Sequence, residues 1–143
     1  MKNVDLVIIG GGPQGAEEGL VLQQEGKNVT VVEMRDQICL GAPYLHYTAV
    51  NKEYLKEGAP KALVNSKCIS ISSEGVLIEN VQTGEQTLCP ADTVLLAIGM
   101  RADLDEVEAY RDCALEFRKI GDCNKPATMT EAVRLGYDVA FGL

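Results

Sequence analysis

One stretch near the start of the chain, residues 4–34, constrains the fold more than any other part. A short apolar run, Asp5 to Ile9, leads directly into three glycines and then Pro-Gln-Gly, which satisfies the pattern Gly-x-Gly-x-x-Gly. The run is too short for a helix, whereas the residues after the turn carry apolar side chains at helical spacing as far as Glu25. The stretch therefore predicts a strand, a glycine turn, a helix and a second strand.

Each glycine of the turn has its own expected role, because each lacks a side chain at a different point. Gly10 lets the chain turn sharply, Gly12 lets a pyrophosphate lie against the backbone, and Gly15 lets the helix approach the strand. The free N–H groups at the helix start, with a dipole equivalent to roughly half a positive charge, favour a diphosphate without a lysine. A glycine turn with a purely structural role is the alternative.

An acidic residue, Glu33, follows the second predicted strand, Val29 to Val32. Its distance from the glycines along the chain is that expected of the acid that accepts hydrogen bonds from an adenosine ribose. A carboxylate there favours NAD over NADP because it repels a 2′-phosphate, and Arg35 would offset part of this repulsion. The candidate cofactor-binding residues of this region are Gly10, Gly11, Gly12, Pro13, Gln14, Gly15, Glu33, Met34 and Arg35.

The rest of the chain predicts an α/β fold. Residues 47–57 predict a second helix and residues 61–64 a third parallel strand. Three short alternating runs between residues 67 and 88, separated by Glu-Gly and Thr-Gly, predict an antiparallel meander in place of a crossover helix. Residues 92–98 predict a fully buried central strand that ends at Gly99, where a glycine suits either a close ligand or a simple turn.

The C-terminal part predicts less regular structure. Residues 103–110 indicate a surface helix or loop, and residues 116–120 indicate a last short strand. Thr128 is expected to cap a final helix that continues to about Ala140. The side chains of this helix expected to face inward are Met129, Ala132, Val133 and Val139.

Composition limits the size and the partners of the protein. At 143 residues the chain is long enough for one ordinary domain and too short for two full nucleotide-binding domains. A net charge of −8 without a basic block argues against nucleic acid and anionic membranes as partners, and no apolar run is long enough to cross a bilayer. We therefore expect a cytoplasmic protein. Five scattered cysteines and the single His46 show no metal-binding or redox spacing, so no metal is expected.

The motifs, taken in order, resemble one enzyme family. GGGPQGAEEG with VVEM, then ADTVLLAIGMRAD, then RKIGDCNKPATMTEAVRLGYDVA resemble the C-terminal part of NADH:flavin oxidoreductases similar to 2-enoate reductase and bacterial 2,4-dienoyl-CoA reductase. In that family an N-terminal barrel carries FMN and an iron–sulfur cluster, and a C-terminal half carries FAD with an inserted nicotinamide domain. The resemblance implies a Rossmann-like NAD(H)-binding domain at residues 1–112 and a returning FAD-domain segment at residues 113–143.

The resemblance also implies roles for single residues. Gly99 would lie at the strand end on the nicotinamide side. Glu17 matches an acid near the flavin face in related domains, although by itself it is an ordinary acid near a helix start. Asp122 matches an aspartate that hydrogen-bonds the flavin ribityl chain, although Gly-Asp is also a common helix-entry turn. The FMN barrel, the cluster cysteines and a first FAD glycine pattern are missing, so no catalytic residue is assigned.

Three functions follow as hypotheses. The leading one is a domain or fragment of a flavin-dependent oxidoreductase that binds NADH and positions the nicotinamide for hydride transfer to FAD. Its partners would be the dinucleotide and the remaining FAD, FMN and iron–sulfur domains. The alternatives are a minimal FAD-binding module and a non-catalytic module that senses a dinucleotide. The C-terminal segment should expose an apolar surface and pair with a second copy, or else rearrange against its own sheet.

Overall fold

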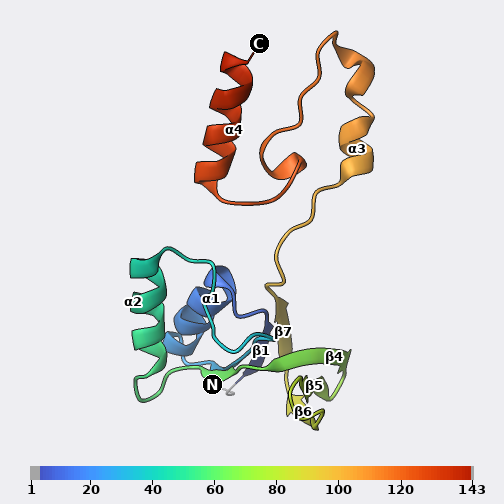
Figure 1. Ribbon diagram of the computed structural model, residues 1–143. Helices are drawn as coiled ribbons and strands as arrows, with labels where there is room; N and C mark the ends of the chain where they lie inside the picture. Colours follow the sequence, from blue (N-terminus) through green and yellow to red (C-terminus); the bar gives the residue numbers. More distant parts are fainter. Residues whose placement is uncertain (1–3, 143) are drawn as a thin grey trace. The chain divides into compact units, whose positions relative to one another are not determined.

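The computed structural model describes residues 4–142 of the chain. This part separates into two compact units, of which the first ends at Gly99 and the second begins at Met100 (Figure 1). The division predicted at residues 112 and 113 concerns which part of a larger enzyme each segment resembles, and it stays a prediction. The first three residues and Leu143, which those predicted ranges include, lie outside the described residues.

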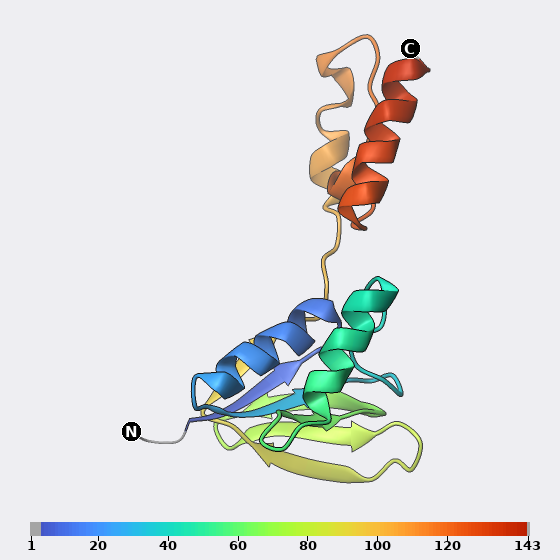
Figure 2. The ribbon, with the colours of Figure 1, turned by 90° about the vertical axis from the view of Figure 1, so that its left-hand side faces the viewer.

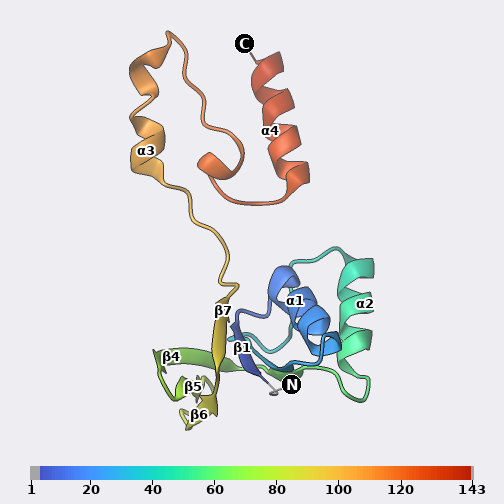
Figure 3. The same cartoon turned by 180° about the vertical axis from the view of Figure 1, so that it is seen from behind.

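A parallel sheet forms the centre of the first unit. Its strands, in spatial order, are β3 (Lys61–Leu63), β2 (Asn28–Val32), β1 (Asp5–Ile9) and β7 (Thr93–Leu96). Two helices, α1 (Pro13–Gln24) and α2 (Tyr44–Tyr54), cover one face of this sheet and lie beside each other (Figures 2 and 3). The strand–turn–helix–strand order predicted for residues 4–34 is therefore confirmed.

A second sheet covers the opposite face. It is an antiparallel meander of β4 (Ser66–Ser72), β5 (Gly75–Asn80) and β6 (Gln86–Pro90). The alternation of β1 explains the three layers, because Leu6 and Ile8 pack toward the helices while Val7 packs against Val76 and Ile78 of the meander. A strand covered on both faces needs a continuous apolar sequence, which β1 has. The predicted α/β fold, with a parallel sheet and an antiparallel meander, is confirmed.

The position of β7 corrects one prediction. Residues 92–98 were expected to form a fully buried central strand, but β7 is shorter and lies at the edge of the described parallel sheet. It pairs with β1 alone among the described strands, and Leu96 and Ile98 are 64% and 71% exposed. An apolar run does not say how many neighbours a strand has, because that depends on other parts of the fold.

The second unit contains helices and turns. These are α3 (Leu104–Glu108), the 3₁₀ turns η1 (Arg111–Cys113) and η2 (Gly121–Cys123), and α4 (Met129–Phe141). The Thr128 hydroxyl accepts a hydrogen bond from the Glu131 amide at 3.2 Å, so the predicted cap of the final helix is confirmed. The predicted strand at residues 116–120 is wrong, since this segment forms no strand. A strand needs a neighbour for its backbone groups, and the described second unit contains none.

One face of α4 is apolar and exposed. Met129 and Val133, expected to face inward, are 81% and 68% exposed, whereas Ala132 and Val139 are partly buried. With Tyr137 and Phe141, whose rings stack at 4.3 Å, Met129 and Val133 form a row at four-residue spacing, called here the C-terminal apolar stripe. The second unit thus exposes an apolar surface. Pairing of this surface with a second copy stays a prediction.

Candidate functional site

The glycine turn connects β1 to α1 at the carboxyl edge of the parallel sheet. Gly10 has φ +107°, and a Cβ atom there would overlap the carbonyl oxygen of Ala97. A Cβ atom at Gly15 would overlap the carbonyl oxygen of Gly10. Both positions therefore require glycine because the turn, the helix and β7 approach one another too closely for a side chain.

Gly12 differs from these two glycines because the space in front of it is open. A Cβ atom at Gly12 would meet no atom of the described chain within 4 Å. Gly12 is also the N-cap residue of α1, where no side chain caps the helix and Pro13 begins it. The first N–H groups of a helix have no partner within the helix. Open space beside uncapped amides is what a bound pyrophosphate requires, so these residues fit that group.

The side chain of Glu33 turns toward the glycine turn. Its Oε2 accepts a hydrogen bond from the Gly11 amide at 2.8 Å, and its Oε1 accepts one from the Arg35 amide at 2.9 Å. Glu33 is 7% exposed, and a Cβ atom at Gly11 would lie only 2.8 Å from the Glu33 Cβ. The second glycine of the turn is therefore needed to let the carboxylate approach.

The environment of Glu33 keeps its carboxyl group ionised. Burial raises the pKa, but hydrogen bonds from the Arg35 amide, the Arg35 side chain and the Gly11 amide lower it by more, so the pKa of Glu33 lies below its ordinary value of 4.5. At neutral pH the group is a carboxylate that accepts hydrogen bonds and donates none. Such a group suits the two hydroxyls of a ribose.

The residues after Glu33 form the rim of this region. Met34 is 61% exposed, and the Arg35 side chain is 47% exposed with its Nε 3.1 Å from Glu33 Oε1. The loop then returns to the turn, where the Cys39 amide donates a hydrogen bond to the Gly11 carbonyl at 2.6 Å. This loop therefore forms a second layer behind the glycine turn.

Sequence reasoning missed several residues that support the glycine turn and Glu33. Cys39 is fully buried with φ +59°, and no pattern in the sequence marks a cysteine as left-handed. Asn65 has φ +51° between β3 and β4 and donates its amide to the Arg35 carbonyl at 2.8 Å. Asparagine tolerates this conformation better than most residues, so Asn65 carried a usable signal. Ser66 also supports the site, because its amide donates to the Glu33 carbonyl at 2.9 Å.

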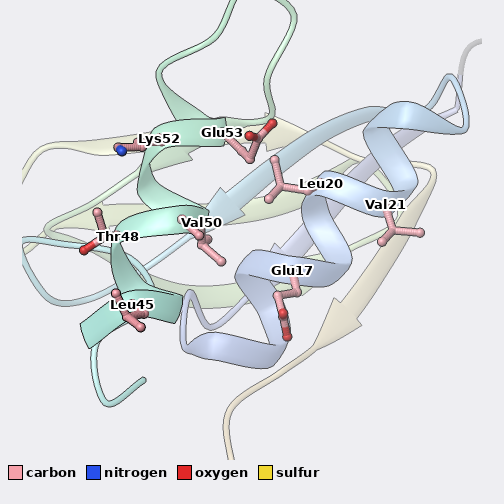
Figure 4. A pocket seen from close by; sticks show the side chains of 9 residues that line it. Glu17, Leu20, Val21, Leu45, Thr48, Val50, Lys52 and Glu53 are labelled. Atoms are coloured by element: carbon pink, nitrogen blue, oxygen red, sulfur yellow. The ribbon is translucent and has the colours of Figure 1, made fainter. Parts of the chain in front are cut away.

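Glu17 lies on α1, and its side chain is 54% exposed. Its Oε1 is 3.0 Å from Nε2 of His46 in the first turn of α2, so the single histidine lies beside an acid of the neighbouring helix. Glu17 also lines an open groove between α1 and α2, together with Leu20, Leu45 and other residues (Figure 4). The structure thus assigns Glu17 a neighbour within the chain.

Gly99 and Asp122 belong to different units of the structure. Gly99 has φ +89° and follows β7, whose residue Leu96 stands opposite Ile9 at the same sheet edge as the glycine turn. Asp122 belongs to the second unit, where its Oδ1 accepts a hydrogen bond from the Ala127 amide at 3.3 Å. The first unit brings together the glycine turn, Glu33 and Arg35.

No group of at least three His, Cys, Asp or Glu side chains arranged to hold a metal ion occurs within residues 4–142. None of the helices in this range is both long and apolar enough to span a membrane.

The parallel sheet, the uncapped helix start behind a glycine turn and the buried acid after β2 together define a dinucleotide-binding α/β domain. The chain belongs to the pyridine nucleotide-disulphide oxidoreductase family, whose model matches residues 1–134. Homologues in this family bind FAD and NAD(P)H.

Individual relatives narrow the class further. The chain is 34% identical over 146 residues to a cinnamate reductase from Clostridium sporogenes, covering 97% of this chain and 21% of that protein. It is 34% identical over 133 residues to a bilirubin reductase from Mediterraneibacter gnavus, covering 92% of this chain and 20% of that protein. The resemblance to NADH:flavin oxidoreductases similar to 2-enoate reductase is confirmed.

A solved structure agrees with these relatives. A 2-naphthoyl-CoA reductase in complex with 2-naphthoyl-CoA matches with a TM-score of 0.79 and 28% identity, covering 93% of this chain and 20% of that one. The chain therefore spans about a fifth of the length of each of these three relatives.

Proposed function

We propose that the first unit binds NAD(H) as the pyridine-nucleotide domain of a flavin-dependent oxidoreductase, and that it positions the nicotinamide for hydride transfer to FAD. The observation that carries the proposal is the open space at Gly12 beside an uncapped helix, with the Glu33 carboxylate bonded to the neighbouring Gly11 amide at 2.8 Å. Bound NADH supplies the hydride. The protein supplies position, because hydride transfer depends on the distance and angle between donor and acceptor.

Each part of the site has one task in this proposal. The amides of Gly12, Gln14 and Gly15 face the pyrophosphate, and Pro13 begins the helix without needing an N–H of its own. Glu33 accepts hydrogen bonds from the adenosine ribose. The remaining members of the proposed site are Gly10, Gly11, Met34, Arg35 and Gly99.

Two acids of the proposal would lie near the flavin rather than the dinucleotide. In the assembled enzyme Glu17 would face the flavin, with His46 Nε2 beside its carboxylate at the observed 3.0 Å. Asp122 would hydrogen-bond the ribityl chain of FAD. Both roles depend on parts of the larger enzyme, so this chain alone is not expected to complete a catalytic cycle.

The partner of the chain would be the remainder of a flavoenzyme. Two observations support this. The chain spans only 21% and 20% of the length of two reductases, and the C-terminal apolar stripe is an exposed apolar surface of the kind that marks an interface. Without that remainder, the stripe would pair two copies into a homodimer. We place the protein in the cytoplasm, since its five cysteines are all free, as is usual in a reducing compartment.

A titration of the full chain with NADH, followed by nicotinamide fluorescence, tests the proposal. Gly12→Ala adds a Cβ atom where the protein leaves open space, so the fold should survive while the pyrophosphate is blocked. We expect the dissociation constant to rise by about tenfold or more, which corresponds to roughly 1.4 kcal/mol.

The matched control is Gly136→Ala, another glycine whose added Cβ would meet no atom within 4 Å. It should leave NADH binding unchanged. Wild-type protein that binds no NADH, or a Gly12→Ala variant that binds it normally, would remove the proposal. Purified protein that retains stoichiometric yellow flavin would favour the FAD-binding alternative instead.

A further inference from the structure

The peptide that joins Gly11 to Gly12 is held by the loop that follows Glu33. The Gly11 carbonyl accepts a hydrogen bond from the Cys39 amide at 2.6 Å. In a trans peptide the carbonyl oxygen and the N–H of the next residue point in opposite directions. The bond from Cys39 therefore points the Gly12 N–H away from the loop. A Cβ atom at Gly12 would meet no atom of the described chain within 4 Å, so a ligand can approach this residue.

The side of Gly11 that faces the loop is closed. A Cβ atom at Gly11 would lie 2.8 Å from the Glu33 Cβ and 3.2 Å from the Ile38 Cγ2. Ile38 and Cys39 are themselves buried. The loop thus fills one side of the turn, while the space beside the following glycine stays open.

The orientation of the Gly12 amide matters because the next residue cannot replace it as a donor. Pro13 begins α1 and has no N–H. The amides that the helix start can offer to a pyrophosphate are therefore those of Gly12, Gln14 and Gly15. A rotation of the peptide between Gly11 and Gly12 would remove one of these donors without changing any side chain.

Cys39 holds its own amide in place through an unusual backbone conformation. Its φ is +59°, which is uncommon for a residue other than glycine. Its side chain is fully buried in a cluster with Ala16 and Val50. Burial and, less strongly, the charge of Glu17 raise the pKa of the thiol, so it is neutral and packs as a small apolar group. A conformation of this kind persists only where the surroundings fix it, which here is the task of the buried cluster.

We propose that Cys39 is a positioning residue for the pyrophosphate of the dinucleotide. Its left-handed backbone directs its amide to the Gly11 carbonyl, and this bond points the Gly12 N–H toward the ligand. The proposal rests on the proposed function, since it concerns the same site. The backbone conformation of Cys39 performs this task, and its sulfur atom contributes only packing.

Two substitutions of Cys39 separate its conformation from its packing. Cys39→Gly adopts a positive φ without strain but loses the side chain, whereas the branched side chain of Cys39→Val fills the space and opposes that conformation. In a titration of the full chain, Cys39→Gly should bind NADH within about threefold of the wild type, and Cys39→Val about fivefold to tenfold more weakly. Val50→Ala removes packing from the same cluster, so it should lower stability and leave NADH affinity unchanged. Thermal melts establish that each variant is folded at the temperature of the titration.

A double variant tests whether Cys39 acts through Gly12. The added Cβ atom of Gly12→Ala keeps the pyrophosphate away from this amide, so its orientation no longer affects binding. In that background Cys39→Val should weaken NADH binding by no more than about twofold. An effect of Cys39→Val that arose only from general loosening of the fold would instead be the same in both backgrounds.

The possible outcomes separate the two proposals. If the wild type binds no NADH, both the proposed function and the role of Cys39 are overturned. If the wild type binds NADH and Gly12→Ala weakens it, but Cys39→Val and Cys39→Gly bind alike, the role of Cys39 alone is overturned. A full effect of Cys39→Val in the Gly12→Ala background overturns it as well.

The wild-type protein gives a second readout that decides the matter should Cys39→Val fail to fold. Saturation with NADH should move the amide-proton NMR resonance of Gly12 downfield, because this N–H gains a charged acceptor. The amide of Gly136 in α4 is the control and should not move. An unmoved Gly12 resonance in protein saturated with NADH overturns the role of Cys39 and leaves the proposed function in place.

Discussion

The carboxylate of Glu33 accepts a hydrogen bond from the Gly11 amide at 2.8 Å, across 22 residues of sequence. This bond ties the end of β2 to the glycine turn after β1. The acid and the turn are consequently in direct contact, so a change at either one alters the surroundings of the other. A ribose and a pyrophosphate held by these two parts would be fixed relative to each other.

Replacement of Glu33 by glutamine should lower stability as well as NADH binding. The amide has one acceptor oxygen where the carboxylate has two, so the Gly11 or the Arg35 amide loses its partner. An unsatisfied buried donor costs about 1–3 kcal/mol, which urea denaturation can measure. Glu25→Gln, at an exposed residue after α1, is the control and should be neutral. Unchanged stability in Glu33→Gln would contradict the observed bonding.

The stability of the first unit should depend on pH through Glu33. Because its pKa is below 4.5 in the folded protein, the unfolded chain binds more protons between the two pKa values, and stability rises with pH there. The contribution is complete above pH 4.5 and is lost as the pH falls through the folded pKa. Urea denaturation at a series of pH values from about 6 to about 3 should show a smaller loss in Glu33→Gln than in the wild type. Equal losses would argue against a lowered pKa.

Two glycines of the turn should respond differently to alanine. At Gly15 the added Cβ atom overlaps the Gly10 carbonyl oxygen, and both belong to backbone that cannot move aside cheaply. Gly15→Ala should therefore lose about 3 kcal/mol or more, or fail to fold. Gly12→Ala should cost at most about 1 kcal/mol, because alanine is only a poorer N-cap residue. Equal effects of the two substitutions in thermal or urea denaturation would contradict this geometry.

Asn65 should be sensitive to the shape of its replacement. At φ +51° glycine is free of strain, whereas a β-branched residue is not. Asn65→Gly should stay within about 1 kcal/mol of the wild type, since it loses mainly the side-chain bond from Gln82 at 3.2 Å. Asn65→Val should lose at least about 1–2 kcal/mol more than Asn65→Gly. Urea denaturation compares the two, and similar losses would show that the backbone relaxes.

The C-terminal apolar stripe should control self-association. Val133 is 68% exposed, so Val133→Asp should leave the fold intact and disrupt any interface built on the stripe. Light scattering coupled to gel filtration should then show a dimer for the wild type and a monomer for the variant. Ser73→Asp, in the exposed turn between β4 and β5, adds the same charge elsewhere and should leave the dimer unchanged. A monomeric wild type would remove the homodimer proposal.

Several features of the protein follow from local sequence. The glycine turn, the alternating runs of the meander and the Thr128 cap each involve residues close together in the chain, and all three elements occur where they are expected. The spacing also singled out Glu33, which the structure places against the glycine turn. Such signals are readable because backbone conformation and side-chain periodicity depend on neighbours within a few residues.

Other features depended on contacts between distant residues. The apolar sequence of β7 did not reveal its edge position, and residues 116–120 lacked a neighbouring strand despite their strand-like sequence. The pairing of Glu33 with Gly11 and Arg35, supported by Asn65 from the meander, was likewise absent from any local pattern. The sequence alone thus determined the order of elements in the first unit and the type of site. Tertiary structure decided which partners satisfy each backbone and charged group, because burial and hydrogen bonding are set by residues that only folding brings together.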